Sequence, residues 1–338
     1  MARTRRVLAK VEFYAFAFFL YDKQLARAMK IVFMGTPQAA ATSLERIVND
    51  GHDVAAVYTQ PDRPSGRGNK IAFSPVKQFA IDNGISVLQP TKVRTPAALA
   101  EFRSHDADVA VVVAHGRILP EAFLQAFPMG AINVHFSLLP KYRGAAPVNW
   151  AIVNGERTTG VTTMKMDAGL DTGPVLMQRQ TDIGENETAV ELLARLSGLG
   201  SDLLSETLRD YSSLTPQPQN DADTSFAPLM KKEDGLINWT LTASEIANRV
   251  RGFQPFPTAF THFRDKKLTI WAAGPVDIDH RLSHPGELVE ATGERLLVFC
   301  GGDSVLRIAE LQLEGKRRVT SRDFINSSRP KIGDRFGS

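Results

Sequence analysis

The sequence predicts an α/β protein, with a doubly wound, Rossmann-like parallel sheet followed by a small, mostly β domain built as an OB-like barrel. From Lys30 to about Arg209, apolar strand-like runs alternate with helical stretches, which is typical of βαβ units. The early runs are almost wholly apolar, as in strands buried on both faces. Beyond about Phe226 the pattern changes to short alternating runs, which favours a second, β-rich domain.

In the first part, each predicted strand is followed by a predicted helix. The predicted strands cover residues 30–35, 52–59, 85–89, 107–116 and 131–135. The predicted helices cover residues 37–50, 74–84, 95–103 and 120–127, with another helix after Pro147. The helix at 74–84 has the clearest boundaries, because Ser74 can cap it, Pro75 suits the first helical position and Gly84 can end it.

The first part is completed by two strand-like runs, 160–166 and 175–183, and by a helix over about 188–209. The stretch that follows, YSSLTPQPQNDADTS, has the composition of a linker. In the last part, one helix at 242–252 stands among strand-like runs such as 258–263, 267–273 and 295–300. We therefore expect a first domain at 29–211, a linker at 212–225 and a C-terminal β-barrel domain at 226–335.

Composition narrows the class of protein. With 338 residues, 43% of them hydrophobic, the chain can bury a substantial core, and its net charge of +3 creates no strong overall field. The single cysteine, Cys300, excludes an internal disulfide and suits a reducing compartment. It follows the apolar run LLVF, which predicts a core position. No apolar stretch reaches the roughly 18 residues of a membrane-spanning helix.

Residues 1–28 have a basic start and a short apolar centre, which loosely resembles a signal peptide. Glu12 beside the apolar centre and the lack of a small-residue cleavage site argue against export. We expect these residues to be an extension outside the fold, with the first domain beginning at Met29.

Asn133 and His135 end the predicted strand AINVH. At positions i and i+2 they face the same side of the strand. An Asn amide can donate to a developing oxyanion, and a His can act as a general acid or base near neutral pH. The alternative is that both side chains only cap loop backbone. The first strand is not followed by G-x-G-x-x-G, so a dinucleotide site is poorly supported.

A carboxylate beside His135 could orient its ring and relay a proton. The stretch MDAGLDTGP offers Asp167 and Asp171 in a loop whose glycines permit a close approach to a ligand. Asp is also common in tight turns, so a purely structural role is the alternative. Spacing along the chain does not decide between the two acids.

The stretches INVHFSLLPKYRGAAP and GVTTMKMDAGLDTGPVL resemble the folate-dependent formyltransferase family, and in particular its members that act on charged tRNA. FMGTP, YTQPDRPSGRGNK and SPVKQFA are also similar, and the resemblance runs from Met29 to about Arg335. It implies a catalytic domain at 29–211 and a tRNA-binding domain at 226–335. Phe136, Lys141 and His115 depart from residues usual in the family, and the bulk of Phe136 is expected to narrow the pocket mouth.

The resemblance implies that the formyl group of 10-formyltetrahydrofolate moves to the amine of methionine on initiator tRNA, without a metal ion. It implies a catalytic set of Asn133, His135 and Asp171, so that Asp167 becomes the lesser candidate. A protonated His135 and Asn133 would stabilise the oxyanion, while Asp171 would hold the His and help to accept the amine proton. The implied folate-site residues are Ser137, Leu138, Leu139, Pro140, Arg117, Ile118 and Leu119.

Two basic clusters are candidates for tRNA contact: Arg63, Arg67 and Lys70 in the loop QPDRPSGRGNK, and Lys316, Arg317 and Arg318 near the C-terminus. Composition alone favours a solvated, flexible loop. The resemblance instead implies that it enters the acceptor stem, with Arg67 as the wedge.

Two other readings stay open, a formyltransferase for a nucleotide-linked amino sugar and a non-catalytic RNA- or folate-binding module. With the tRNA reading we expect a monomer in the cytoplasm of a bacterium.

Overall fold

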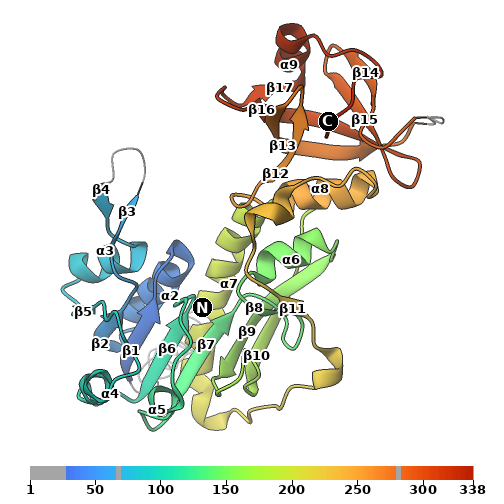
Figure 1. Ribbon diagram of the computed structural model, residues 1–338. Coiled ribbons are helices and arrows are strands. Elements are labelled where there is room, and N and C mark those ends of the chain that lie inside the picture. Colours follow the sequence, from blue (N-terminus) through green and yellow to red (C-terminus); the bar gives the residue numbers. More distant parts are fainter. Residues whose placement is uncertain (1–27, 66–69, 279–282, 338) are drawn as a thin grey trace, which may run out of the picture. The chain divides into compact units, whose positions relative to one another are not determined.

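The computed structural model describes residues 28–65, 70–278 and 283–337 (Figure 1). The predictions for residues 1–27 and for Arg67 fall outside these residues. Arg63 and Lys70 are described by their backbone alone, in two short paired strands, β3 (Arg63–Ser65) and β4 (Lys70–Ala72).

The first part of the chain forms a seven-stranded sheet, in the order β10, β9, β7, β6, β1, β2, β5. The strands are, in sequence order, β1 (Lys30–Gly35), β2 (Asp53–Tyr58), β5 (Val87–Leu88), β6 (Val109–Val113), β7 (Ala131–His135), β9 (Thr158–Lys165) and β10 (Val175–Asp182). All the pairings among β5, β2, β1, β6 and β7 are parallel, so the predicted parallel sheet is confirmed. β1 lies between β2 and β6, which makes this the topological switch point of the sheet.

The helices largely follow the predicted alternation. They are α2 (Gln38–Asn49), α3 (Pro75–Asp82), α4 (Pro96–Arg103), α5 (Glu121–Leu124), α6 (Pro147–Val153) and α7 (Ala189–Asp210). The Ser74 side chain accepts the backbone N–H of Lys77, so the predicted cap of α3 is confirmed. α5 is shorter than predicted, because the chain turns after Leu124 instead of continuing to Phe127.

The chain packs as two compact units, and strands β7 and β9 contribute residues to both. The first unit comprises the described residues up to Val134, with 163–168 and 201–217; the second comprises 135–162, 169–200 and the rest of the described chain. In the first unit, one face of β1 presents Val32 and Met34 to a cluster that contains Phe102 of α4 and Phe123 of α5. The opposite face of β1 is also fully buried, and α2 contacts β1, β2 and β6. A strand buried on both faces explains the almost wholly apolar run at 30–35.

Gly35 ends β1 where the chain turns toward α2. A Cβ atom at this position would lie 2.6 Å from the Cβ of Ala40 and 2.8 Å from the carbonyl oxygen of Val113. Both distances are far below van der Waals contact, so the close approach of α2 to the sheet requires glycine here.

In the second unit, the C-terminal part is an antiparallel sheet in the order β12, β13, β16, β15, β14, with β17 paired to β16, and this confirms the predicted mostly β domain. Its strands are β12 (Ala259–Phe263), β13 (Lys266–Val276), β14 (Leu288–Thr292), β15 (Arg295–Cys300), β16 (Ser304–Leu313) and β17 (Val319–Thr320). Its helices are α8 (Ala243–Gly252), α9 (Ser321–Ser328) and the 3-10 turn η3 (Lys232–Gly235).

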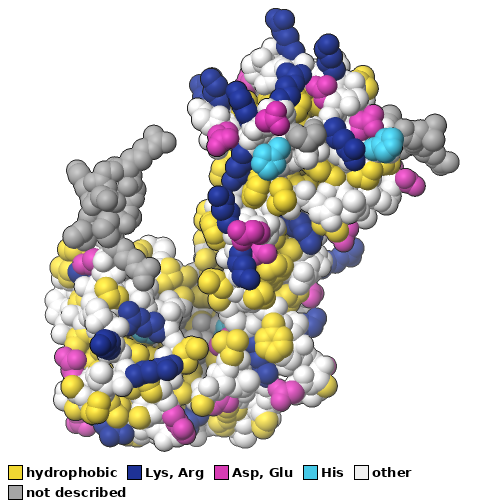
Figure 2. Space-filling view, viewed as in Figure 1, with side chains coloured by type: hydrophobic (Ala, Val, Ile, Leu, Met, Phe, Trp, Pro, Cys, Tyr) yellow, Lys and Arg dark blue, Asp and Glu magenta, His cyan; other side chains and the backbone are white. Residues whose placement is uncertain are grey.

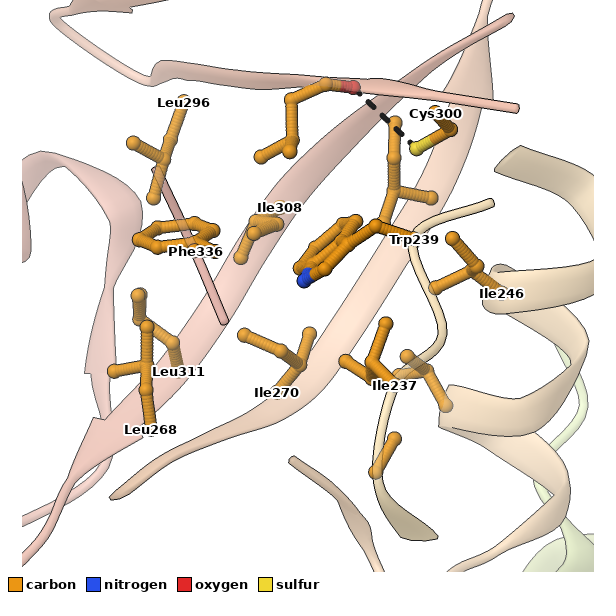
Figure 3. Close-up of a cluster of buried hydrophobic side chains, with 14 of the residues drawn as sticks. Ile237, Trp239, Ile246, Leu268, Ile270, Leu296, Cys300, Ile308, Leu311 and Phe336 are labelled. Carbon is orange, nitrogen blue, oxygen red and sulfur yellow. Dashed lines mark hydrogen bonds between the residues drawn. The ribbon is translucent and has the colours of Figure 1, made fainter. Parts of the chain in front are cut away.

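The core of this sheet is built around Trp239, whose indole N–H donates to Thr261 Oγ1 at 3.1 Å. Figure 3 shows Trp239, Phe336 and aliphatic side chains from several strands and α8 pointing toward one another. Cys300 belongs to the same cluster, which confirms its predicted core position. Burial raises the pKa of its thiol to about 12, so the side chain stays an uncharged thiol.

Residues 211–227, which include the predicted linker, carry local structure. They contain two 3-10 turns, η1 (Tyr211–Ser213) and η2 (Asp221–Asp223), and a short strand, β11 (Phe226–Ala227). β11 pairs in parallel with β8 (Arg143–Gly144). The end of this segment is therefore hydrogen-bonded to the polar stretch that follows β7.

Candidate active site at the end of β7

Asn133 is held by its side-chain amide. Its Nδ2 donates to the carbonyl oxygen of Val112 on the adjacent strand β6, at 3.0 Å. An amide nitrogen carries two hydrogens, and one bond to Val112 leaves the second available. Oδ1 of Asn133 is buried and has no hydrogen-bond partner among the described residues. The sheet thus fixes the orientation of the amide without using all of its hydrogen-bonding capacity.

His135 follows two residues later on β7, so both side chains leave the same face of the strand. The ring is only 6% exposed, and its Nε2 lies 2.9 Å from the carbonyl oxygen of Tyr142. A carbonyl oxygen accepts and cannot donate, so Nε2 must carry the hydrogen. In the neutral ring, Nδ1 is then the nitrogen with a free lone pair.

Asp171 faces that second nitrogen. Its Oδ2 lies 3.7 Å from Nδ1 of His135 and accepts the backbone N–H of Gly144 at 2.8 Å. The gap of 3.7 Å exceeds a direct hydrogen bond, so the proton of a charged ring is not committed to Asp171.

The loop geometry separates the two acids that sequence spacing left open. Asp171 has a positive φ of 53°, a conformation that Asp adopts more readily than most residues, and this backbone turns its carboxylate to His135 and Gly144. Asp167 is exposed and instead helps to line a cavity of about 410 Å³ together with Glu121, Lys165 and apolar side chains. Geometry therefore favours Asp171 as the partner of His135.

Sequence reasoning missed two backbone groups of this site. The carbonyl of Tyr142 sets the tautomer of His135, and the N–H of Gly144 binds the carboxylate of Asp171. Backbone groups are common to every residue, so no side-chain motif could reveal them. The positive φ values, 62° at Tyr142 and 122° at Gly144, show how sharply the chain turns to present them. In the sequence, the glycine in YRGAAP indicated this sharp turn, because glycine readily adopts positive φ values.

The predicted folate segment SLLP forms a tight turn. The hydroxyl of Ser137 is buried and donates to the carbonyl of Lys141 at 2.6 Å, while the N–H of Leu139 donates to Thr162 Oγ1 at 3.1 Å. Leu139 is buried, and Leu138 and Pro140 are half-buried. The turn is therefore anchored by its polar groups. Phe136, the unusual residue beside it, is 7% exposed.

The second predicted folate segment, Arg117, Ile118 and Leu119, lies in the first unit. The Arg117 guanidinium donates to Gln60 Oε1 at 3.1 Å and to the carbonyl of Pro90 at 2.7 Å. Ile118 is 71% exposed, whereas Leu119 is buried. The apolar side chain of Ile118 is therefore accessible to a ligand, and it lies next to an arginine that is held by hydrogen bonds.

His115 precedes this segment. Burial, with a contribution from the charge of Arg117, lowers the pKa of its ring to about 4. The imidazole is therefore neutral near pH 7, and neither ring nitrogen has a partner among the described residues.

The structure describes the side chains of only some of the candidate tRNA-binding residues. Asp62, the acid within the sequence QPDRPSGRGNK, is bound to Lys77 and to Gln89. In the C-terminal domain, Lys316, Arg317 and Arg318 are exposed, and Figure 2 shows Lys and Arg side chains spread among acidic ones over this part of the surface. Arg318 pairs with Glu310, and its guanidinium lies 5.1 Å from the ring centre of Trp271.

The described part of the chain contains neither a metal-ligand cluster nor a helix suited to cross a membrane. These residues include no group of three or more His, Cys, Asp or Glu placed to hold a metal ion. None of the helices described is both long enough and apolar enough to cross a membrane.

Comparison with known families gives a consistent result. A family model described as Formyl transferase matches residues 29–208, and one described as Formyl transferase, C-terminal domain, matches residues 229–329. The chain is 48% identical over 311 residues to the methionyl-tRNA formyltransferase of Geobacter metallireducens, covering 91% of this chain and 99% of that protein. It is 49% identical over 312 residues to that of Koribacter versatilis, with 91% and 99% covered.

Solved structures share the fold at lower identity. A sugar 3N-formyl transferase, crystallised with dTDP and 5-N-formyl-THF, has a TM-score of 0.63 at 20% identity, covering 86% of this chain and all of that one. An N-formyltransferase from Helicobacter canadensis, in complex with folinic acid and dTDP-3-aminofucose, has a TM-score of 0.62 at 21% identity, with 83% and 98% covered. At such identities the likeness extends to the fold alone.

Proposed function

The chain belongs to the formyl transferase family, and on that premise we propose that it is an enzyme that formylates initiator methionyl-tRNA. The formyl group of 10-formyltetrahydrofolate is transferred to the free amine of the methionine, which gives N-formylmethionyl-tRNA for translation initiation. The observation that carries this proposal is the identity of nearly half of all aligned residues, over 91% of the chain, with curated methionyl-tRNA formyltransferases.

The chemical step is assigned to Asn133, His135 and Asp171. The methionine nitrogen forms a bond to the formyl carbon, and the formyl oxygen gains negative charge. The second N–H of Asn133 and the Nδ1–H of a protonated His135 donate to that oxygen. When the bond from the formyl carbon to the folate nitrogen breaks, the electron pair returns to that nitrogen, which takes up a proton.

The amine must lose a proton during the transfer. The carboxylate of Asp171 is the acceptor at the site, reached through water, and its negative charge also stabilises the charged ring of His135. Tyr142 and Gly144 hold these two side chains in place through their backbone. In this scheme the residues of the chain supply hydrogen-bond donors, a base and orientation, and the reaction needs no metal.

Folate binding is assigned to two segments, 137–140 and 117–119. The anchored turn of the first segment and the exposed Ile118 of the second support this assignment. The tRNA is assigned to the basic loop near Arg67 and to the cluster at Lys316. In this scheme the catalytic domain is 29–211, a linker at 212–225 follows, and 226–335 binds tRNA. The enzyme acts as a monomer in the cytoplasm of a bacterium, where charged tRNA is available.

A formyl-transfer assay tests the proposed acceptor. The purified protein is given 10-formyltetrahydrofolate and either charged initiator tRNA or a nucleotide-linked amino sugar. We expect formylation of methionyl-tRNA and none of the sugar. The sugar is the right competitor because sugar formyltransferases share the fold at a TM-score of about 0.6. Activity on the sugar alone would refute the proposal, and no activity on either acceptor would favour a binding module.

Arg67→Ala tests the role of the basic loop. We expect the KM for methionyl-tRNA to rise at least about tenfold, because a phosphate or stacking contact of an arginine is lost. The KM for the folate should stay within about twofold of the unchanged enzyme, since the loop is not assigned to that substrate.

Lys92→Ala serves as the control for Arg67→Ala, because it removes another exposed cation outside both assigned sites. An unaltered KM for tRNA in Arg67→Ala would remove this residue from the tRNA interface. Binding of tRNA by the unchanged protein should also weaken as salt is added, because cations on the protein replace counterions on the phosphates.

A further inference from the structure

Gln219 lies in the predicted linker and uses the full hydrogen-bonding capacity of its side chain. Its Nε2 donates to the carbonyl oxygens of Asp171, at 2.8 Å, and Gly173, at 2.7 Å. Its Oε1 accepts from Nε and Nη2 of Arg143, at 3.0 and 2.7 Å. A primary amide has two hydrogens to donate and two lone pairs to accept with, and here all four are used.

The partners of Gln219 leave no doubt about the orientation of its amide. Two carbonyl oxygens can only accept and a guanidinium can only donate, so nitrogen and oxygen cannot be exchanged. Arg143 is 4% exposed, and a buried charge of this kind requires acceptors. The acceptors of Arg143 are Gln219 and Asp221, and Oδ1 of Asp221 lies 3.0 Å from Nη2 of Arg143. Residue 219 thus links the loop of Asp171 to the stretch that follows β7.

The same segment also fixes the backbone of that stretch. The hydroxyl oxygen of Ser225 accepts the N–H of Tyr142 at 2.9 Å, and its carbonyl accepts the N–H of Arg143 at 2.9 Å. A Cβ atom on Gly144 would lie 2.7 Å from the carbonyl oxygen of Ala227. We call residues 219–227 the brace.

The groups that the brace holds are those that orient the proposed catalytic pair. Tyr142 presents its carbonyl to His135, and Gly144 presents its N–H to Asp171. Asp171 has a left-handed backbone conformation, which is strained for a residue other than glycine and persists only where neighbouring groups enforce it. Gln219 bonds to the carbonyl of that same residue.

We propose that Gln219 and Ser225 are positioning residues, through which the brace sets the geometry of His135 and Asp171. This inference rests on the proposed function. Within the described part of the chain, neither side chain hydrogen-bonds to His135 or to the carboxylate of Asp171, so both act through other groups. Displacing a reacting group by about 1 Å can cost a factor of about 100 in rate, which makes such positioning measurable.

Gln219→Glu is the sharpest test, because it conserves size. The carboxylate still accepts from Arg143, but it turns an oxygen toward the carbonyls of Asp171 and Gly173, which repel it. We expect kcat for formyl transfer to fall about 10- to 100-fold. The KM for each substrate should change less than about threefold. The kcat is calculated from the concentration of folded protein, so that a loss of stability cannot produce this split. Gln217→Glu is the matched control, since its side chain is exposed and, among the described residues, donates only to the carbonyl of nearby Thr215.

A kcat for Gln219→Glu within twofold of that of Gln217→Glu would overturn the proposal. If Gln219→Glu does not fold, Ser225→Ala decides: it removes the acceptor of the Tyr142 N–H, and we expect kcat to fall at least about threefold with KM preserved. An unchanged kcat in Ser225→Ala would then overturn it. A different result would refute the proposed function itself: the unsubstituted protein would not formylate methionyl-tRNA at all.

Discussion

Replacing Asp171 by Asn is expected to lower kcat for formyl transfer about 1,000- to 10,000-fold, while the affinity for the folate stays nearly unchanged. Asn is isosteric and can still accept the N–H of Gly144, so the loop should keep its shape. It has no negative charge to stabilise a charged His135 and cannot take the amine proton. The equivalent change in a Ser-His-Asp triad, where the Asp orients the His and stabilises its charged form, costs about 10,000-fold.

Single-turnover kinetics and a folate-binding titration together measure this effect. Asp167→Asn is the matched control, because it makes the same substitution four residues earlier in the same loop. Its kcat should stay within about threefold of the unchanged enzyme. If Asp167→Asn were the inactive variant and Asp171→Asn were active, the two acids would have been assigned in the wrong order.

Replacing Asn133 by Ala is expected to lower kcat by about 100- to 1,000-fold, the usual effect of losing one oxyanion donor. This equals about 3–4 kcal/mol of transition-state stabilisation. The amide is held by the carbonyl of Val112, which orients the second N–H before the reactants bind. KM values should change little, because the formyl oxygen carries its charge only in the transition state.

The loss of a buried hydrogen bond also lowers stability, so Asn133→Ala needs a control of its own. Asn149→Ala removes a comparable bond, from Nδ2 to the carbonyl of Gly252 at 2.7 Å, away from β7. Both variants should lose a few degrees in Tm. Only Asn133→Ala should also show the loss of kcat expected for a missing oxyanion donor. Equal kcat values for the two variants would exclude Asn133 from the chemistry.

The parallel strands of the first part were predictable because each is a short, mostly apolar run bounded by turn signals. β6, with the sequence VAVVV, is buried along its whole length, which is what its composition predicts for a central parallel strand. Asn133 and His135 were also accessible, because alternation along one strand places both on the same face without any knowledge of the fold.

For the predicted linker, composition does not reveal whether the segment is solvated or bonded to the rest of the protein. Its Pro, Ser, Gln and Asp content is that of a solvated connection, yet Gln219 and Ser225 bond to residues more than 40 positions away in the chain. Polar residues of this kind occur both in free linkers and in buried networks. Only the partners distinguish the two cases, and partners distant in sequence leave no local signature.

The sequence by itself determined the alternation of strands and helices in the first part, the shared face of Asn133 and His135, and the family resemblance, because local periodicity and ordered motifs carry that information. The tertiary structure decided that Asp171 and not Asp167 faces His135, which nitrogen of the ring carries its proton, and that Gln219 is bonded to the loop of Asp171. These depend on backbone groups and on a left-handed turn at Asp171. Such features arise only when segments distant in sequence are packed together.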